Sequence, residues 1–304
     1  MMQKTRRLEA MSTRHMVVAG HPFAVQAGLS ILEAGGNAVD AGVAVGLCIN
    51  VLESEMTGFG GVAPAMVRMA GGDAVDVFVG VGPWPMALDA AYFRERHGGR
   101  VPQGILDTVV PAAPDIWLTA LERYGTMAFG DVAVAAIRLA REGFPMYPFM
   151  REALEGHFEE FRGLPNTAAI FCPGGRLPAV GETFVQADLA RTLQFLADEE
   201  AAGAAQGGRS AGIDAARRAF YAGDVAAAIV RQQEAEGGLM TREDLSRFRA
   251  EIEPATRARF AGCDIYGCGA WSQGPMVLGA AQILDGLDLR GMGSNSTAYI
   301  HAVT

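Results

Sequence analysis

The stretch HPFAVQAGLSILEAGGNAVDAGVAVGLCINVL, residues 21–52, decides the fold of this chain. Its first half places apolar residues at helical spacing and ends at Gly35 and Gly36, a pair that can adopt the positive φ of a helix C-terminus. Asn37 then restarts the chain. Residues 38–52 are small and apolar on every face, which is typical of a helix that other layers cover on all sides. We therefore expect two consecutive helices, the second of them central.

The chain that follows these helices changes to sheet. Residues 65–69 and 74–79 are separated by a short Gly-Gly-Asp turn and predict a β-hairpin. The glycines and prolines of residues 80–85 then predict a rigid turn around Trp84.

Later segments are mainly helical in pattern. Residues 131–142 predict an amphipathic helix with Asp131 as its N-cap, whereas the Ala- and Gly-rich residues 203–212 predict a surface loop. Further predictions are helices at 114–124, 224–236 and 275–287, a capping box at Thr241 and Asp244, and a strand at 259–266. A last helix opens near Ser296 and runs to the end of the sequence, and we expect further polypeptide to continue it.

Composition narrows the functional classes. The net charge of −9 argues against nucleic-acid binding, which needs a concentrated positive surface. Lys4 is the only lysine, so neither a Schiff-base lysine nor a phosphate-binding Walker lysine is available within the rest of the chain. The longest apolar run, residues 39–52, is interrupted by Asp40 and Asn50 and is too short to cross a bilayer. We expect neither a nucleic-acid partner nor a membrane.

The N-terminus predicts a location and a domain boundary. Residues 1–14 contain basic residues without a following apolar run, so we expect no secretory signal and a cytoplasmic protein. Residues 1–16 are expected to form a flexible extension, and residues 17–304 a single domain. The four cysteines and five histidines show no metal-ligand spacing, so neither a metal nor a cofactor is expected.

A glycine-rich turn follows the second helix. Gly58, Gly60, Gly61 and Ala63 match the dinucleotide-binding fingerprint in their spacing. That fingerprint requires an entering strand and a leaving helix, whereas here a helix enters and a strand leaves. We therefore interpret the segment as a tight backbone turn, and a nicotinamide enzyme would be reconsidered only if a strand entered Gly58.

Two carboxylates and one polar turn are candidate site residues. Glu53 and Glu55 could act as an acid/base pair, but side chains two residues apart at a helix end diverge, so capping or a hydrogen bond to the loop is favoured. The turn at residues 272–274 (Ser, Gln, Gly) could donate hydrogen bonds into a site or cap the next helix. No nucleophilic triad can be selected from spacing, because triads are spatial.

Several segments together resemble the gamma-glutamyltranspeptidase family. The matching residues begin with His21, Pro22, Ala27, Gly28, Ile31, Leu32, Gly35, Gly36, Asn37, Ala38, Asp40 and Ala41, then Glu53, Met56, Thr57, Gly58, Gly60 and Gly61. They continue with Val110, Pro111, Ala112, Trp117, Ala136, Ile137, Leu139, Ala140, Gly143, Phe144, Gln186, Asp188, Leu189, Thr192, Leu193, Phe220, Tyr221, Gly223, Ile229, Gly237, Gly238, Leu239, Thr241, Asp244 and Leu245. The resemblance covers the chain from about Val17 to its end.

The resemblance implies an α+β fold, the four-layer αββα sandwich of N-terminal-nucleophile hydrolases. It implies a precursor that cuts itself into a large and a small subunit, with a threonine at the start of the small subunit as the nucleophile and its α-amine as the base. This sequence resembles the large subunit, so no catalytic residue is expected here, and Thr304 is not expected to be that threonine. The expected partners are the small subunit, in a heterodimer, and a small-molecule amide.

Two departures from the family pattern concern the substrate. Relatives that act on glutathione carry an arginine that binds the γ-glutamyl α-carboxylate. At the matching place this chain has Val81, Gly82, Pro83 and Trp84, and these are the predicted substrate-binding residues. The turn at residues 269–275 is similar to that of the oxamate amidohydrolase branch. We therefore expect an amide substrate other than an ordinary γ-glutamyl compound. The alternatives are transfer to an amino acid or peptide, a genuine gamma-glutamyltransferase or glutathione hydrolase in glutathione metabolism, and a non-catalytic binding protein on the same fold.

Overall fold

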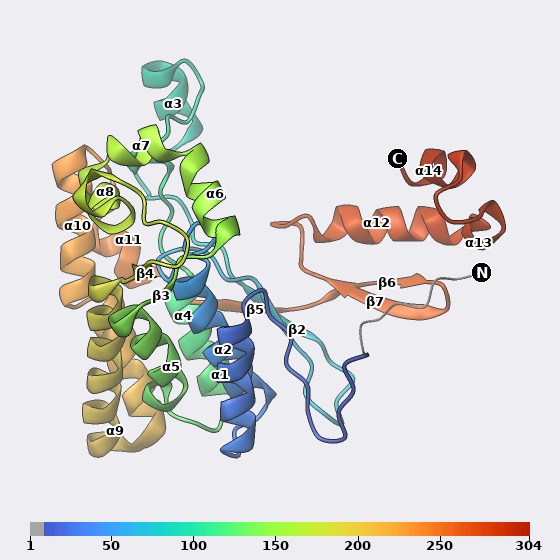
Figure 1. Ribbon diagram of the computed structural model, residues 1–304, viewed down its shortest axis with the longest axis horizontal. Coiled ribbons are helices and arrows are strands. Elements are labelled where there is room, and N and C mark those ends of the chain that lie inside the picture. The colour runs from blue at the N-terminus through green and yellow to red at the C-terminus, as the bar shows by residue number, and fades with distance from the viewer. Residues whose placement is uncertain (1–8) are drawn as a thin grey trace. The chain divides into compact units, whose positions relative to one another are not determined.

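The computed structural model describes residues 9–304, which form two compact units (Figure 1). The first unit holds the residues up to Val62 together with Gly82–Phe248, and the second holds Ala63–Val81 and Arg249–Thr304. The expected domain limits of 17–304 stay a prediction, and the expectations for residues 1–8 lie outside the described residues.

The first unit is built on the two helices predicted from residues 21–52. Helix α1 spans Pro22–Glu33, and Nδ1 of His21 accepts a hydrogen bond from the Phe23 N–H at 3.1 Å, which caps the start of the helix. Gly35 takes a φ of 96° just after the helix, as its position in the sequence predicted. Helix α2, Ala38–Leu52, is buried on most of its faces and packs against α1, α4 and α5, which confirms its central place.

A buried aspartate fixes the beginning of α2. The carboxylate of Asp40 accepts the Asn37 N–H at 2.8 Å and the Thr126 hydroxyl at 2.6 Å, and it also accepts the N–H groups of Thr126 and Met127 from the loop after helix α4 (Ala113–Tyr124). Burial acts to raise the pKa of Asp40, but these hydrogen bonds outweigh it and lower the pKa below its ordinary value. The start of α2 and the end of α4 are therefore joined through one charged group.

Helix α5, Phe129–Glu142, begins two residues earlier than predicted. Its N-cap is Ala128, and Asp131 is not the cap but accepts a hydrogen bond from the Ala128 N–H at 3.4 Å. The first helical N–H groups, of Phe129 and Gly130, instead donate to the buried carboxylate of Glu200 at 2.6 and 2.8 Å. A residue 70 positions away along the chain thus caps the helix, which a local pattern cannot predict.

The loop predicted at residues 203–212 is wrong in its extent, because only Gly207 and Gly208 leave the helical conformation. This segment lies within α9, Ala187–Tyr221, whose only break is at Gly207 and Gly208, where φ at Gly208 is 78°. The two helical arms pack closely on each other: a Cβ on Gly203 would lie 2.6 Å from the Ala215 methyl, and one on Gly212 would lie 2.7 Å from the Glu200 carbonyl oxygen. Small residues are needed here because helix backbones approach each other, and not because the chain is a loop.

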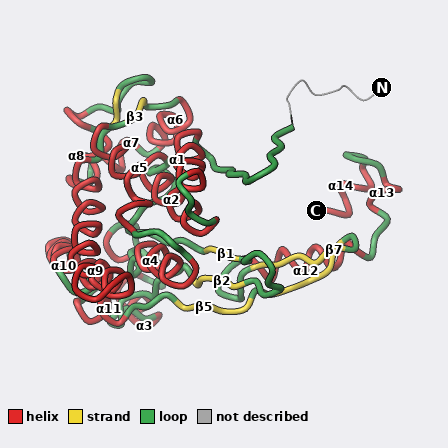
Figure 2. The backbone as a smooth tube through the Cα atoms, turned by 90° about the horizontal axis from the view of Figure 1, so that it is seen from below, coloured by secondary structure: helices red, strands yellow, loops and turns green. Residues whose placement is uncertain are grey.

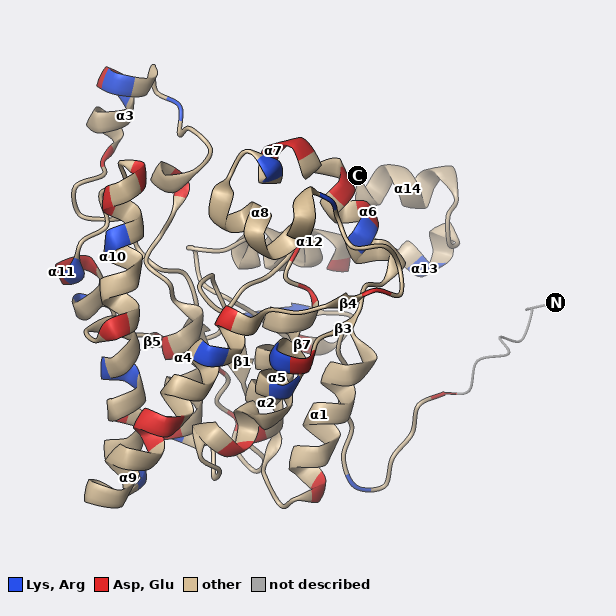
Figure 3. Cartoon of the chain, turned by 60° about the vertical axis from the view of Figure 1, so that its left-hand side comes forward, with Lys and Arg blue, Asp and Glu red and all other residues tan. Residues whose placement is uncertain are grey.

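The remaining elements of the first unit are short, apart from α10, which spans Asp224–Glu236 as predicted. They are α3 (Ala90–His97), α6 (Pro148–Gly156), α7 (Phe158–Arg162), α8 (Pro165–Phe171), α11 (Arg242–Arg247), two 3-10 turns (Ile105–Asp107 and Pro173–Gly175) and the strand pair β3 (Phe144–Pro145) and β4 (Thr183–Phe184). Figure 3 shows acidic and basic residues interspersed along α9 and α10. That mixture is typical of a solvated helix surface.

The second unit contains the predicted hairpin and a second one. Strand β1 (Ala65–Val67) pairs antiparallel with β2 (Asp76–Val79), which pairs antiparallel with β5 (Glu251–Pro254), as Figure 2 shows in yellow. The single strand predicted at 259–266 is wrong: β6 (Thr256–Phe260) and β7 (Cys263–Gly267) form a hairpin that turns at Ala261 and Gly262, both with positive φ. Three helices complete the unit, α12 (Gly274–Asp285), α13 (Leu289–Met292) and α14 (Thr297–Val303).

The close approach of the α9 arms gives a direct test. Gly212→Ala places a methyl group against the backbone of Glu200, so we expect a lower free energy of unfolding in chemical denaturation of the full-length protein. Gly156→Ala is the matched control, because nothing lies within 4 Å of its Cβ position at the end of α6. The control should be neutral or more stable, by up to about 1 kcal/mol. Equal stability of the two variants would contradict the packed helical arms.

Candidate functional site

The predicted substrate-binding segment is fixed through its backbone. The Val110 N–H donates to the Pro83 carbonyl at 2.9 Å, and the Met86 N–H donates to the Asp244 carboxylate at 2.8 Å. Gly82 must be glycine, because a Cβ there would lie 1.7 Å from the Val110 carbonyl oxygen. The segment that begins at Gly82 is therefore anchored on both sides of Trp84.

The side chains of this segment are apolar and partly exposed. The Trp84 ring packs edge-on against Phe93 with centroids 5.0 Å apart, and the residue keeps 38% of its surface exposed. Val81, which belongs to the second unit, is 39% exposed. No residue from 81 to 85 is charged, so this segment itself offers no partner for a substrate carboxylate. Whether it contacts substrate stays a prediction.

The start of α4 positions two loops at once. The N–H groups of Ala112 and Ala113 both donate to the Gly61 carbonyl, at 2.9 and 3.0 Å, and the neighbouring Val110 holds Pro83. The Gly61 N–H closes a tight turn on the Gly58 carbonyl at 3.0 Å. Helix α2 precedes this turn and strand β1 follows it, so the strand-turn-helix order that dinucleotide binding requires is absent here.

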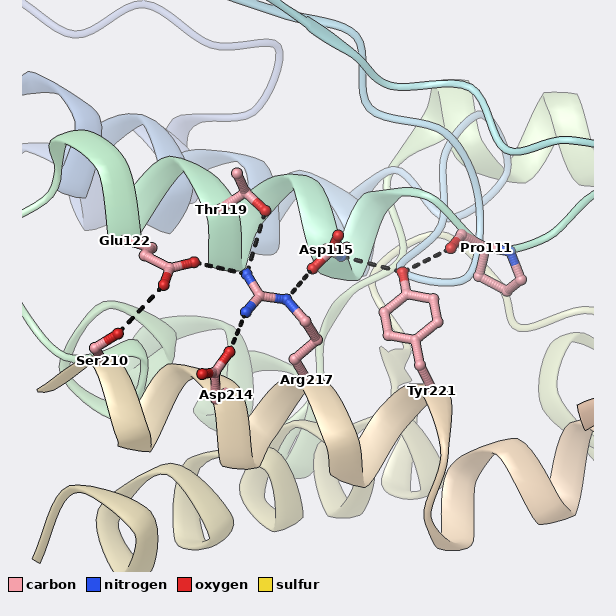
Figure 4. A network of polar contacts seen from close by, with 8 residues as sticks. All are labelled: Pro111, Asp115, Thr119, Glu122, Ser210, Asp214, Arg217 and Tyr221. Carbon is pink, nitrogen blue, oxygen red and sulfur yellow. Dashed lines mark hydrogen bonds and ion pairs between the residues drawn. The ribbon is translucent and has the colours of Figure 1, made fainter. Parts of the chain in front are cut away.

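A buried polar network holds the start of α4 against α9 (Figure 4). The Tyr221 hydroxyl donates to the Pro111 carbonyl at 2.7 Å and accepts the Asp115 N–H at 3.2 Å. One turn away, the Arg217 guanidinium donates through Nε to the Asp115 carboxylate at 2.5 Å. Arg217 also pairs with Asp214 at 2.6 Å and Glu122 at 2.9 Å.

Arg217 and Asp115 form an ion pair that is almost closed to water, with side chains 8% and 1% exposed. Burial acts to lower the pKa of Arg217, but the carboxylates of Asp115 and Glu122 reverse this effect and raise it above the ordinary value. Removing one partner of such a pair leaves an uncompensated buried charge, which is the costly outcome. The network is therefore structural and fixes the geometry of Pro111 and its neighbours.

A hollow of about 680 Å³ opens elsewhere in the first unit. It lies where the start of α1, the end of α2 and the chain entering α6 meet. Its lining residues are Gly20, His21, Pro22, Phe23, Glu53, Pro145, Tyr147 and Phe149. The lining thus combines aromatic rings with one carboxylate, and it contains no serine, threonine, cysteine or lysine that could act as a nucleophile.

The titratable groups around this hollow have shifted pKa values. Burial, and then the nearby charge of Glu55, raise the pKa of Glu53 above its ordinary value of 4.5. The Tyr147 hydroxyl lies 2.8 Å from a Glu55 carboxylate oxygen, and burial together with that contact raises its pKa. Burial lowers the pKa of His21, whose Nδ1 accepts the Phe23 N–H, so the neutral ring carries its proton on Nε2. Groups with shifted pKa values that gather in a hollow mark a candidate functional site.

Only part of this hollow was predicted from the sequence. For Glu53 and Glu55 the pattern favoured capping or a hydrogen bond to the loop, whereas Glu55 accepts a hydrogen bond from the Tyr147 hydroxyl, in the chain before α6. His21 was used as the start of a helix and as the first residue of the family resemblance, and Tyr147 was not singled out, because no local signal for it exists. At the polar turn, the capping alternative fits, because the Ser272 hydroxyl accepts the Gly274 N–H at 2.9 Å.

The described residues contain neither a metal-binding cluster nor a membrane-spanning helix. Across residues 9–304, no three His, Cys, Asp or Glu side chains gather in a way that could hold a metal ion. Within the same range, no helix has both the length and the apolar character needed to span a bilayer.

Comparison with known proteins identifies the class and then the family. The fold is that of the Helicobacter pylori gamma-glutamyltranspeptidase crystal structure, with a TM-score of 0.86 and 25% identity over 97% of this chain and 82% of that one, which confirms the predicted fold class. The family described as Gamma-glutamyltranspeptidase matches residues 24–304, and the chain belongs to this family.

Two curated relatives carry different functional names. The chain is 32% identical to the "Glutathione hydrolase-like YwrD proenzyme" of Bacillus subtilis (strain 168), over 96% of this chain and 52% of that protein. It is 31% identical to the "Acylase ACY 1 proenzyme" of Pseudomonas sp. (strain SE83), over 96% of this chain and 51% of that protein. The chain spans about half the length of these relatives.

The buried ion pair should carry a large share of the stability. Arg217→Met leaves Asp115 charged and buried, so we expect a loss of about 3–5 kcal/mol in the free energy of unfolding. The control is Arg138→Met, which removes an exposed pair with Glu142 at 3.9 Å and should cost at most about 1 kcal/mol. Similar losses in denaturant unfolding of the two variants would show that the network does not anchor α4.

The raised pKa of Glu53 predicts that the stability of the folded chain depends on pH. A carboxyl group whose pKa is higher in the folded chain than in the unfolded chain binds more protons in the folded state. The free energy of unfolding therefore falls as the pH rises from 4.5 through the folded pKa. We therefore expect Glu53→Gln to melt at a higher temperature than the parent at pH 7, and the difference to shrink below pH 4.5. Glu152→Gln, at an exposed position on α6, should give no such trend. A Glu53→Gln variant less stable at pH 7 would reverse the assigned sign.

Proposed function

We propose that the chain is the large-subunit portion of a self-processing amide hydrolase of the gamma-glutamyltranspeptidase family. In this proposal, a threonine at the start of the small subunit, made from the same precursor, takes the acyl group from an amide and passes it to water. The family match supports the reaction class. The word "proenzyme" in the names of both curated relatives supports processing into two subunits.

The proposed substrate is a small amide whose acyl group is not γ-glutamyl. The observation that carries this proposal is the segment at residues 81–85, which has no arginine where the resemblance leads one to expect it. A guanidinium makes two parallel hydrogen bonds to a carboxylate, and neither valine nor tryptophan can replace them. The Gly82 backbone contact with Val110 supports the proposal further, since it limits how far this segment can shift to bring in another residue.

A genuine glutathione hydrolase or gamma-glutamyltransferase is the second candidate. The name of the Bacillus subtilis relative favours it, whereas the name of the Pseudomonas relative favours acylase chemistry. The two differ in whether a substrate α-carboxylate is recognised. Hydrolysis of γ-glutamyl p-nitroanilide, compared with oxamate and simple acyl amides, therefore separates them.

Val81→Arg should increase the activity of the enzyme on γ-glutamyl substrates. We expect the parent full-length protein to hydrolyse γ-glutamyl p-nitroanilide poorly, and the variant to raise kcat/KM for it by about tenfold or more, which one added charged hydrogen bond can supply. Val180→Arg, at a position 56% exposed elsewhere in the chain, is the control for added charge and should have no effect. Fast γ-glutamyl turnover by the parent would overturn the substrate proposal and support the glutathione hydrolase.

Two further parts of the proposal have their own tests. A non-catalytic binding protein on this fold would show neither self-cleavage nor amide hydrolysis, so either activity excludes it. A cytoplasmic location is proposed on the sequence grounds given above. Cell fractionation that recovers the protein outside the cytoplasm contradicts that location without affecting the proposed reaction.

A further inference from the structure

The lining of the hollow at His21, Glu53 and Tyr147 has an unusual composition for a surface. Three aromatic rings, of Phe23, Tyr147 and Phe149, border it together with the imidazole of His21. Phe23 and Phe149 keep 40% and 61% of their surface exposed. Large aromatic side chains that stay exposed around one depression are typical of a binding site rather than of a packed surface.

The charge of the hollow is negative and no lining residue neutralises it. Glu53 is the one charged residue of the lining, and Glu55 lies close enough behind it to affect its ionisation. Arg151 lies one turn beyond Tyr147, but its guanidinium pairs with Glu155 at 3.1 Å. His21 adds no positive charge at neutral pH, since burial lowers its pKa.

Behind Tyr147, one carboxylate oxygen of Glu55 lacks a partner. Oε2 of Glu55 is buried and has no hydrogen-bond partner among the described residues, and the same holds for Oγ of Ser54 and Nη1 of Arg151. The other Glu55 oxygen accepts from Tyr147 at 2.8 Å. Glu55 therefore adds a second negative charge behind the Tyr147 wall of the hollow.

We propose that this hollow binds a small organic ammonium ion, with the Glu53 carboxylate pairing the charge and the rings of Phe23, Tyr147 and Phe149 enclosing the apolar body. The carboxylate accepts N–H hydrogen bonds that are strengthened by charge. The ring faces attract the cation through their quadrupoles. The volume of about 680 Å³ fits a molecule of this class.

The chemistry expected of this hollow is the binding of a cation. The hollow shares no residue with the predicted substrate-binding segment at residues 81–84, and its lining contains no serine, threonine, cysteine or lysine. An anion is disfavoured there by Glu53 and Glu55. A neutral molecule of the same shape would use the rings but not the carboxylate, so charge distinguishes the proposal from simple apolar binding.

Calorimetric titration of the full-length protein with benzylamine, which is protonated at pH 7, tests the proposal. We expect saturable binding of benzylamine at pH 7 and binding at least about tenfold weaker for benzyl alcohol, its neutral analogue, and for benzoate. Glu53→Gln should weaken benzylamine binding by a similar factor. Phe149→Ala should weaken it about two- to fivefold through the loss of one ring.

Two controls make the result decisive. Glu152→Gln, on the exposed surface of α6, should leave benzylamine affinity unchanged. The melting temperature of each variant shows whether it is folded. Equal affinity for benzylamine and benzyl alcohol, unchanged affinity after Glu53→Gln, or no binding of benzylamine at millimolar concentration would each overturn the proposal.

Discussion

The ion pair between Arg217 and Asp115 is the interaction on which the predicted substrate segment depends. It joins the second arm of α9 to the first turn of α4 in a place that water does not reach. Tyr221, one turn along α9, fixes the Pro111 carbonyl. The residues beside Pro111 in turn hold both the Gly58–Gly61 turn and the Pro83 backbone. This charged contact therefore helps to hold the start of α4, whose neighbouring backbone contacts both loops.

The chemistry proposed for this family member follows from what these loops present. A rigid backbone at Gly82 and Pro83 displays a valine and a tryptophan, and neither side chain can bind a carboxylate in the way that an arginine does. Selectivity would then come from shape and from the lack of a charge partner, which disfavours an acyl group with its own carboxylate. The hollow at His21, Glu53 and Tyr147 differs from this segment, because its lining carries a negative charge beside its aromatic rings.

Local patterns in the sequence predicted most helices but not the contacts between them. Both helices of residues 21–52 were predicted because the glycine pair, the restart of the chain at Asn37 and the apolar run are all local signals. Residues 203–212 misled because small residues serve equally in loops and in closely packed helices, and only the partner arm decides between them. The cap of α5 was missed for the same reason, since Glu200 arrives from a distant part of the chain.

The candidate site was still harder to predict than the fold. Glu53 was visible as a carboxylate beside a glycine turn, but Tyr147 carries no motif, and the hollow exists only because α1, α2 and the chain before α6 meet there. Family resemblance supplied the reaction class, which the residues alone left open.

The central claim is that these residues belong to the large subunit of an enzyme that cuts itself, and intact mass spectrometry of the purified full-length protein tests it most directly. The account predicts two polypeptides whose masses add up to the precursor plus one water, with threonine as the first residue of the smaller one. A single uncut polypeptide that still hydrolyses amides would contradict it.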